Sequence, residues 1–140
     1  MAAELPVVSL LRVAQEDLVG ARALAMIGNR NAIYLVEQAA EKVIRAVLTA
    51  ERKHAGISHR LSDMVDMVSA GSPLLASLRA IQDLSAYATT YRYPSPVGRI
   101  PASPDPARFA EFARLVEVAL MQAASEFRVD LGGGPPSRSA

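Results

Sequence analysis

The feature that most constrains this chain is the run from Arg30 to Lys53, where apolar side chains recur at the three- and four-residue spacing of a long helix. At about 100° per residue, they cover roughly half of the helix circumference. Such a wide apolar arc is typical of a helix that packs against several neighbours, so we expect a bundle with this helix at its centre. The arc consists of Ala32, Val36, Ala39, Ala40, Val43, Ile44, Val47 and Leu48.

The composition favours close-packed helices over a sheet. Hydrophobic residues make up 51% of the chain but aromatic residues only 5%, whereas a sheet prefers aromatic and β-branched side chains. The 140 residues predict a single domain. Because there is no cysteine, disulfides, thiolate metal sites and cysteine nucleophiles are excluded. A net charge of +1 without a strongly basic block argues against avid, sequence-independent binding to duplex nucleic acid.

Apolar stripes and capping residues predict four further helices. The first ends at Gly28, after which Asn29 can cap the long helix, so these two helices should run antiparallel. A proline-rich loop from Tyr93 to Asp105 separates the last two helices. The predicted ranges are Leu5–Ile27, a short helix His59–Ser69, a helix capped by Ser72 and Pro73 that continues through Tyr91, and a helix that opens at Asp105-Pro106 and continues through Phe127.

The predicted fold is therefore all-α. It is an antiparallel, up-and-down bundle of four longer helices and one short helix, formed by residues 1–128. Residues 129–140 are rich in Gly, Pro and Ser and are expected to form a disordered tail. No stretch has the roughly 18 uninterrupted apolar residues of a membrane span, and charged residues interrupt the N-terminal region where a signal peptide would need an apolar one. We expect a cytoplasmic protein that does not contact membranes.

Two carboxylates interrupt the apolar stripes. Glu37 falls inside the arc of the long helix, and Asp17 falls inside the stripe of the first helix. A carboxylate in the core needs a cation or a hydrogen-bond donor, or it becomes neutral. Two interpretations remain open: both side chains sit at stripe edges and reach water, or they are buried. If they are buried, the natural partners are Arg92, Arg60 or His59.

Other familiar chemistry is poorly supported. Glu51 and His54 form a Glu-x-x-His pair, the spacing of carboxylate-bridged di-iron bundles. Such a site needs a second pair, and the other histidine, His59, has no Glu three residues before it. A solvated helix end is the better interpretation, so we expect no metal and no cofactor. Neither a nucleophile elbow nor a Gly-rich phosphate loop is present.

The run Tyr91-Arg92-Tyr93-Pro94 has two interpretations. Arg92 can be a helix C-terminal cation that interacts with the helix dipole, with local packing of the two tyrosines. Alternatively, a guanidinium beside two aromatic rings is suited to recognition of phosphates and bases.

Four short segments, in order, resemble those of the HEPN domain, the helical family named for higher eukaryotes and prokaryotes nucleotide binding. The resemblance covers Leu5 to Phe127, with the Arg-Tyr-Pro element ending the fourth helix and a His-x-Leu element at the third. The matching segments are Glu16-Asp17-Leu18, Gln38-Ala39-Ala40-Glu41-Lys42, Ser58-His59-Arg60-Leu61 and Tyr91-Arg92-Tyr93-Pro94.

This resemblance implies an antiparallel bundle that usually forms a homodimer. Many members of the family are encoded beside a small nucleotidyltransferase, with which they form a two-component, toxin–antitoxin-like system. A subset are ribonuclease toxins, in which an Arg followed after four to six residues by His builds a composite site across the dimer. Here the corresponding positions hold Val97-Gly98-Arg99, so this signature is absent. Without that His, RNA cleavage lacks its obvious general acid and base.

The sequence therefore predicts a dimeric, non-enzymatic module that binds a nucleotide, an RNA or another phosphate-bearing ligand and partners a small nucleotidyltransferase. Two alternatives remain: a ribonuclease toxin with a variant site that uses His59 and Arg92, and a purely structural dimerisation partner whose wide apolar arc completes a core only in the dimer. The predicted ligand-binding residues are Lys42, His59, Arg60, Tyr91, Arg92 and Tyr93, with Asp17 and Glu37 as buried polar residues.

Overall fold

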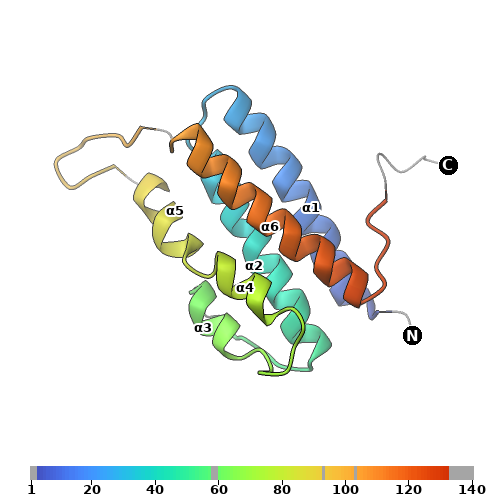
Figure 1. The fold of residues 1–140 in the computed structure, drawn as a ribbon. Helices are drawn as coiled ribbons and strands as arrows, with labels where there is room; N and C mark the ends of the chain where they lie inside the picture. Colours follow the sequence, from blue (N-terminus) through green and yellow to red (C-terminus); the bar gives the residue numbers. More distant parts are fainter. Residues whose placement is uncertain (1–2, 58–59, 93, 103, 133–140) are drawn as a thin grey trace.

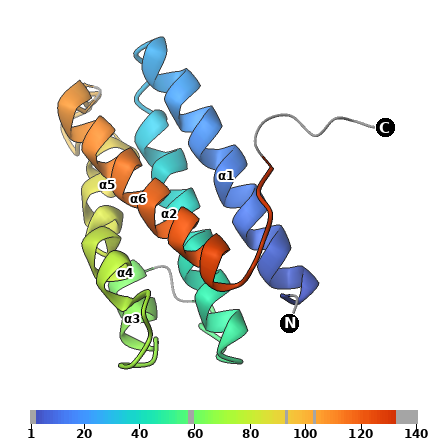
Figure 2. The same ribbon diagram turned by 45° about the vertical axis from the view of Figure 1, so that its right-hand side comes forward.

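The computed structural model describes residues 3–57, 60–92, 94–102 and 104–132, with the backbone alone at Arg92. Within these residues there are six helices and no strand, which confirms the all-α prediction (Figure 1). The three long helices lie side by side, and the three short ones cover the side that they leave open (Figure 2). The helices are α1 (Leu5–Met26), α2 (Ala32–Ala50), α3 (Leu61–Asp66), α4 (Leu75–Ile81), α5 (Leu84–Arg92) and α6 (Pro106–Glu126).

Helix α2 is the central helix of the bundle, as its wide apolar arc predicts. It contacts α1, α3, α5 and α6. The predicted arc is buried along its whole length, and Ile33, Glu37 and Ala46 extend it further. Small side chains on α2, such as Ala39 and Ala40, let its neighbours approach closely.

The ends of α2 differ from the predicted range of Arg30 to Lys53. The helix begins two residues later, because Asn31 rather than Asn29 is its N-cap; the side-chain oxygen of Asn29 instead accepts the backbone N–H of Asn31 at 2.8 Å. It ends at Ala50 because Arg52 adopts a left-handed conformation with φ 59°. The N–H of Lys53 then closes the helix end on the Leu48 carbonyl at 2.8 Å. The preceding turn follows the prediction, with Gly28 at φ 71° just after α1.

The predicted helix from Pro73 to Tyr91 is two helices, α4 and α5, separated at Gln82 and Asp83. Neither Gly nor Pro marks this break. Leu78, Ile81 and Leu84, which stand on either side of it, are all buried, so both helices contribute to the core.

The remaining helices match their sequence signals to different degrees. Helix α6 begins as predicted, with the Asp105 carboxylate accepting the Arg108 N–H at 3.2 Å. Helix α3 is shorter than the predicted His59–Ser69, although Leu61, Val65 and Val68 are buried as expected. After α6, Val129 and Leu131 are half-buried against the core, and the division into a bundle and a disordered tail stays a prediction.

Glu51 links the end of α2 to the chain that follows α3 through hydrogen bonds and an ion pair. Its carboxylate accepts the Ser69 N–H at 3.1 Å and the Ser69 hydroxyl at 3.0 Å, and the Lys53 ammonium lies 3.1 Å away. Lys53 also donates to the Met67 carbonyl at 2.7 Å. Burial alone would raise the pKa of Glu51, but the hydrogen bonds from Lys53 and Ser69 outweigh it and hold the pKa below its ordinary value of 4.5. Glu51 is therefore part of a helix junction.

Removing packing from the buried face of α2 should destabilise the whole bundle. Ile44 is fully buried, so Ile44→Ala is expected to lower the free energy of unfolding by about 2–5 kcal/mol through lost burial and the cavity left behind. The matched control is Ile57→Ala, at a residue that is 89% exposed, which should change stability by less than about 0.5 kcal/mol. Urea denaturation measures both; equal effects would contradict the central role of α2.

The Glu51 junction should make stability depend on pH. Because the folded pKa is lowered, the carboxylate stabilises the fold above its unfolded pKa, and this contribution is lost as the pH falls through the folded pKa. Glu51→Gln should therefore destabilise the protein by about 1 kcal/mol at pH 7 and have little effect at pH 3. Glu126→Gln, at an exposed residue of α6, is the control. A Glu51→Gln effect of equal size at both pH values would show that the charge does not matter.

Candidate functional site

A row of polar side chains follows one side of α2, next to its apolar arc. We call Arg30, Tyr34, Glu37, Glu41 and Arg45 the polar stripe. Arg30 stands in the turn just before α2, and the other four recur every three or four residues and so share one side of the helix. Glu41 accepts a hydrogen bond from the Arg45 Nε at 2.9 Å. Glu37 is buried, with only 6% of its surface exposed.

The chain after α2 folds back along this stripe. The Arg45 guanidinium donates to the Gly56 carbonyl at 3.4 Å. This contact holds the start of the returning segment, defined here as residues 56–61, against α2. At the end of this segment, the Leu61 N–H donates to the Ser85 hydroxyl at 3.3 Å, which fixes the start of α3 against α5. Ser58 and His59 lie between these two contacts in the sequence but outside the described residues.

The other end of the stripe is attached to the end of α5. The Arg30 guanidinium donates to the Tyr91 carbonyl at 3.0 Å, in a partly buried position. Arg92 is the last residue of α5, seven residues after Ser85, and so occupies a position on the same side of that helix. The Arg92 side chain and Tyr93 lie outside the described residues.

The ring of Tyr91 packs within an aromatic cluster between α5 and α6. It meets Tyr87 edge-on at 5.2 Å between ring centroids, and Tyr87 lies 4.9 Å from Phe112. The Arg108 guanidinium lies 5.0 Å from the centre of the Tyr87 ring. Burial raises the pKa of Tyr87 to about 12, with a further contribution from Tyr91. Tyr87 therefore remains a neutral phenol at physiological pH.

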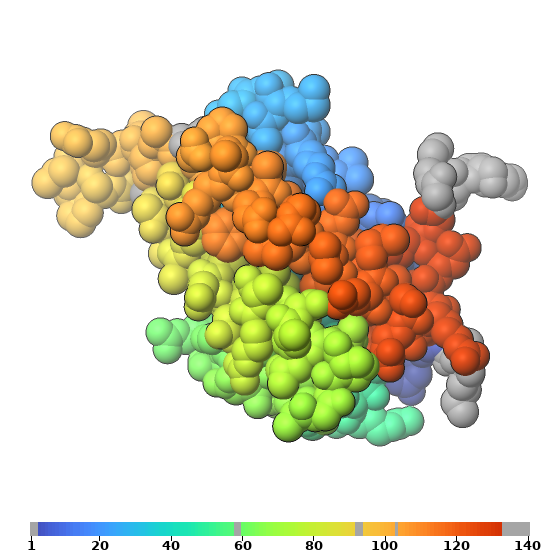
Figure 3. Space-filling model, in the orientation of Figure 1, coloured from blue at the N-terminus to red at the C-terminus, as the bar shows by residue number. Residues whose placement is uncertain are grey.

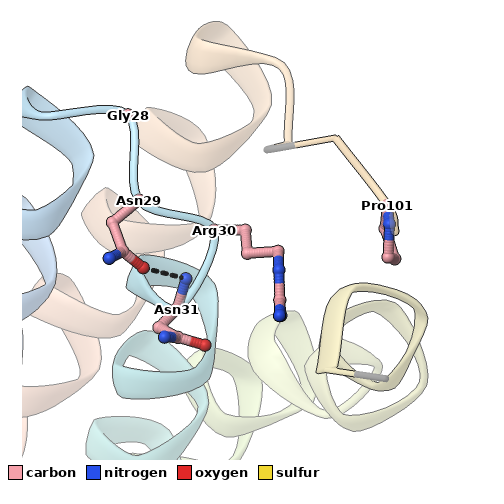
Figure 4. Close-up of a pocket in the computed structure, with 5 residues that line it drawn as sticks. All are labelled: Gly28, Asn29, Arg30, Asn31 and Pro101. Atoms are coloured by element: carbon pink, nitrogen blue, oxygen red, sulfur yellow. Dashed lines mark hydrogen bonds between the residues drawn. The ribbon is translucent and has the colours of Figure 1, made fainter. Parts of the chain in front are cut away.

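A polar pocket of about 370 Å³ opens at the start of α2 (Figure 4). The turn between α1 and α2 forms one wall, the Arg30 side chain extends from it toward α5, and Pro101 faces it from the loop before α6. None of the lining residues is acidic, and Arg30 contributes a guanidinium. This chemistry suits an anion. The lining residues are Gly28, Asn29, Arg30, Asn31 and Pro101.

Asp17 and Lys42 lie on the opposite flank of α2. The Lys42 ammonium is 2.6 Å from the Asp17 carboxylate, and their side chains are 26% and 18% exposed. Asp17 is thus half-buried, and this ion pair ties α1 to α2. The partners that the sequence suggested for a buried Asp17 were Arg92, Arg60 and His59, whereas the half-buried Asp17 pairs with Lys42.

Arg60 is exposed and stands immediately before α3. The structure thus brings the segments that flank the predicted His59 and Arg92 toward one side of α2, whereas Lys42 lies on the other.

Sequence reasoning missed Arg30 as a site residue, because it was counted only as the first residue of the long helix. Its signal was its place directly after the Gly28-Asn29 turn, where a side chain can reach a neighbouring helix end.

Within the described ranges, no group of three His, Cys, Asp or Glu side chains could hold a metal ion. The helices of this part of the chain are also too short or too polar to cross a membrane.

Comparison with known proteins agrees with this architecture. No curated protein and no solved structure gives a significant match to the chain. A family model for the HEPN domain, however, matches residues 7–119. The match runs from the first turn of α1 into the second half of α6 and so includes every helix described above. Because it covers most of the chain, the protein belongs to the HEPN domain family.

Proposed function

We propose that this protein binds a nucleotide or another phosphate-bearing ligand in the polar pocket beside Arg30. The observation that carries the proposal is the pocket itself: about 370 Å³ of space, an arginine in its wall and no acidic side chain among its lining residues. Arg30 is also oriented, because its Nη1 donates to the Tyr91 carbonyl. A planar guanidinium with five N–H donors is the side chain best matched to phosphate oxygens.

The charge distribution around the pocket supports an anionic ligand. From Leu84 to Pro104 the sequence contains two arginines, Arg92 and Arg99, and no acidic residue. This segment includes Tyr91, which meets Arg30, and Pro101, which lines the pocket. The net charge of this segment is therefore positive, which favours the approach of an anion.

The proposal extends to two partners. A second copy of the chain would form a homodimer, and a small nucleotidyltransferase would form the other half of a two-component, toxin–antitoxin-like system. Membership of the family and the resemblance of the four sequence segments support both partners.

Isothermal titration calorimetry with AMP, ATP and inorganic phosphate tests the ligand site. At least one of these should bind to the wild-type protein. Arg30→Ala is expected to weaken that binding at least tenfold, about 1.4 kcal/mol, because it removes the oriented cation. Arg92→Ala should also weaken it.

Two comparisons make this test specific. Arg79→Ala removes an exposed arginine that pairs with Asp66, and should leave binding unchanged. Arg30→Lys keeps the charge but loses the planar fork, so it should retain part of the affinity. A wild-type protein that binds none of the three probes, or equal binding by wild type and Arg30→Ala, would overturn the proposal.

A second candidate function is RNA cleavage at a variant site that uses His59 and Arg92. The contacts at Gly56 and Leu61, which hold both ends of the returning segment against α2 and α5, support it. A histidine on this segment could act as general acid and base, and an arginine could stabilise the developing negative charge on the phosphate.

This alternative predicts growth arrest and loss of cellular RNA when the chain is expressed. His59→Ala and Arg92→Ala should each relieve the arrest by removing a group that acts in the reaction. His54→Ala is the matched control, because His54 is the other histidine in the sequence and is exposed. Harmless expression of the wild-type protein with intact RNA would exclude the ribonuclease.

A further inference from the structure

The loop before α6 projects from the body of the bundle as a narrow finger, defined here as residues 94–102 (Figures 1 and 3). Its tip is a closed turn. The Ser95 N–H donates to the Arg99 carbonyl at 2.8 Å, and the Gly98 N–H donates to the Ser95 carbonyl at 2.8 Å. The Ser95 hydroxyl accepts the Arg99 N–H at 3.0 Å, and Gly98 supplies the left-handed φ of 83° that the turn requires.

This finger presents apolar side chains to the outside. Val97 at its tip is 87% exposed and Ile100 is 67% exposed. Because hydrogen bonds already hold the turn closed, docking it would cost little conformational entropy. A preorganised turn with an exposed aliphatic tip is well suited to insertion into an apolar pocket.

The same end of the chain carries such a pocket. It encloses about 270 Å³ where α1 ends and where α2 and α6 begin. That volume is ample for an aliphatic side chain, since a cavity of about 150 Å³ holds a benzene molecule. The exposed carboxylate of Asp105 stands between two of its lining prolines. The pocket is lined by Ala25, Met26, Gly28, Asn29, Ala32, Pro104, Pro106 and Phe109.

We propose that the finger of one copy inserts Val97 into this apolar pocket of a second copy. Arg99, two residues beyond the tip residue, would then meet Asp105 at the rim, so the charges of the two elements are complementary. The finger and the pocket lie at the same end of the bundle, so a two-fold axis makes the exchange reciprocal. Within one chain, the finger instead projects away from the body (Figure 3).

This inference specifies the interface of the homodimer in the proposed function. The proposed interface does not depend on the ligand, because the residues that line the apolar pocket are mainly apolar and the contact needs no phosphate. The two pockets do share Gly28 and Asn29, so they are neighbours at this end of the bundle.

The absence of native cysteines makes disulfide trapping a clean test. A tagged Val97→Cys variant is mixed with an untagged Met26→Cys variant of the full chain and oxidised mildly. Val97 and Met26 are 87% and 88% exposed, so both variants should fold. A disulfide-linked heterodimer is expected at several-fold higher yield than with Leu5→Cys, which is 79% exposed at the other end of α1. Equal yields with both α1 variants would overturn the proposal.

Sedimentation equilibrium gives an independent measurement. Val97→Asp should raise the dimer dissociation constant at least tenfold, because it places a carboxylate in the apolar pocket. Ile57→Asp, at an equally exposed residue outside the finger, should leave it unchanged. A wild-type monomer at micromolar concentration, or a dimer insensitive to Val97→Asp, would overturn the finger interface. Loss of ligand binding with intact trapping would instead count against the proposed function alone.

Discussion

The structure depends on the burial of one helix on almost every side. More than half of the residues of α2 are buried, from Ala32 to Leu48, and its neighbours can meet it only because many of those residues are small. The fit between α1 and α2 is close: a Cβ atom added at Gly20 of α1 would lie 3.2 Å from the Cδ1 atom of Leu35 in α2. A helix surrounded in this way has one orientation relative to its neighbours, so every group on its remaining side is held in a fixed direction.

That remaining side is where the chain places its polar chemistry. Both arginines of the polar stripe donate to backbone carbonyls of other segments, Arg30 to Tyr91 and Arg45 to Gly56. The first contact caps a carbonyl in the last turn of α5, which has no partner within its own helix, and the second holds the irregular segment before α3. The stripe thus positions the end of α5 at one of its ends and the segment before α3 at the other.

Much of the fold could be predicted from single-helix patterns. The α6 start was predictable because Asp105-Pro106 is a local signal, and the α1 stripe because its apolar residues keep one phase. The break between α4 and α5 was missed because neither Gly nor Pro marks it. The early end of α2 was missed because Arg52, not a glycine, adopts the left-handed conformation.

The site was less predictable, because it depends on the register between helices. A helical wheel shows that Asp17 is out of place in its stripe, but not that Lys42 on the next helix lies opposite it. Likewise, nothing local to Arg30 shows that the end of a helix some sixty residues later lies within its reach. By contrast, the sequence segments that carry the family resemblance lie in the part of the chain matched by the HEPN domain model.

The distribution of aromatic residues has a practical consequence. The chain has no tryptophan, and its four tyrosines are Tyr34 in the polar stripe and Tyr87, Tyr91 and Tyr93 at or next to α5. Its near-ultraviolet absorbance and intrinsic emission therefore come mainly from one region of the molecule, with Tyr87 and Tyr91 close enough to exchange excitation energy. Without any label, the optical spectrum of this protein reports on the neighbourhood of its candidate site.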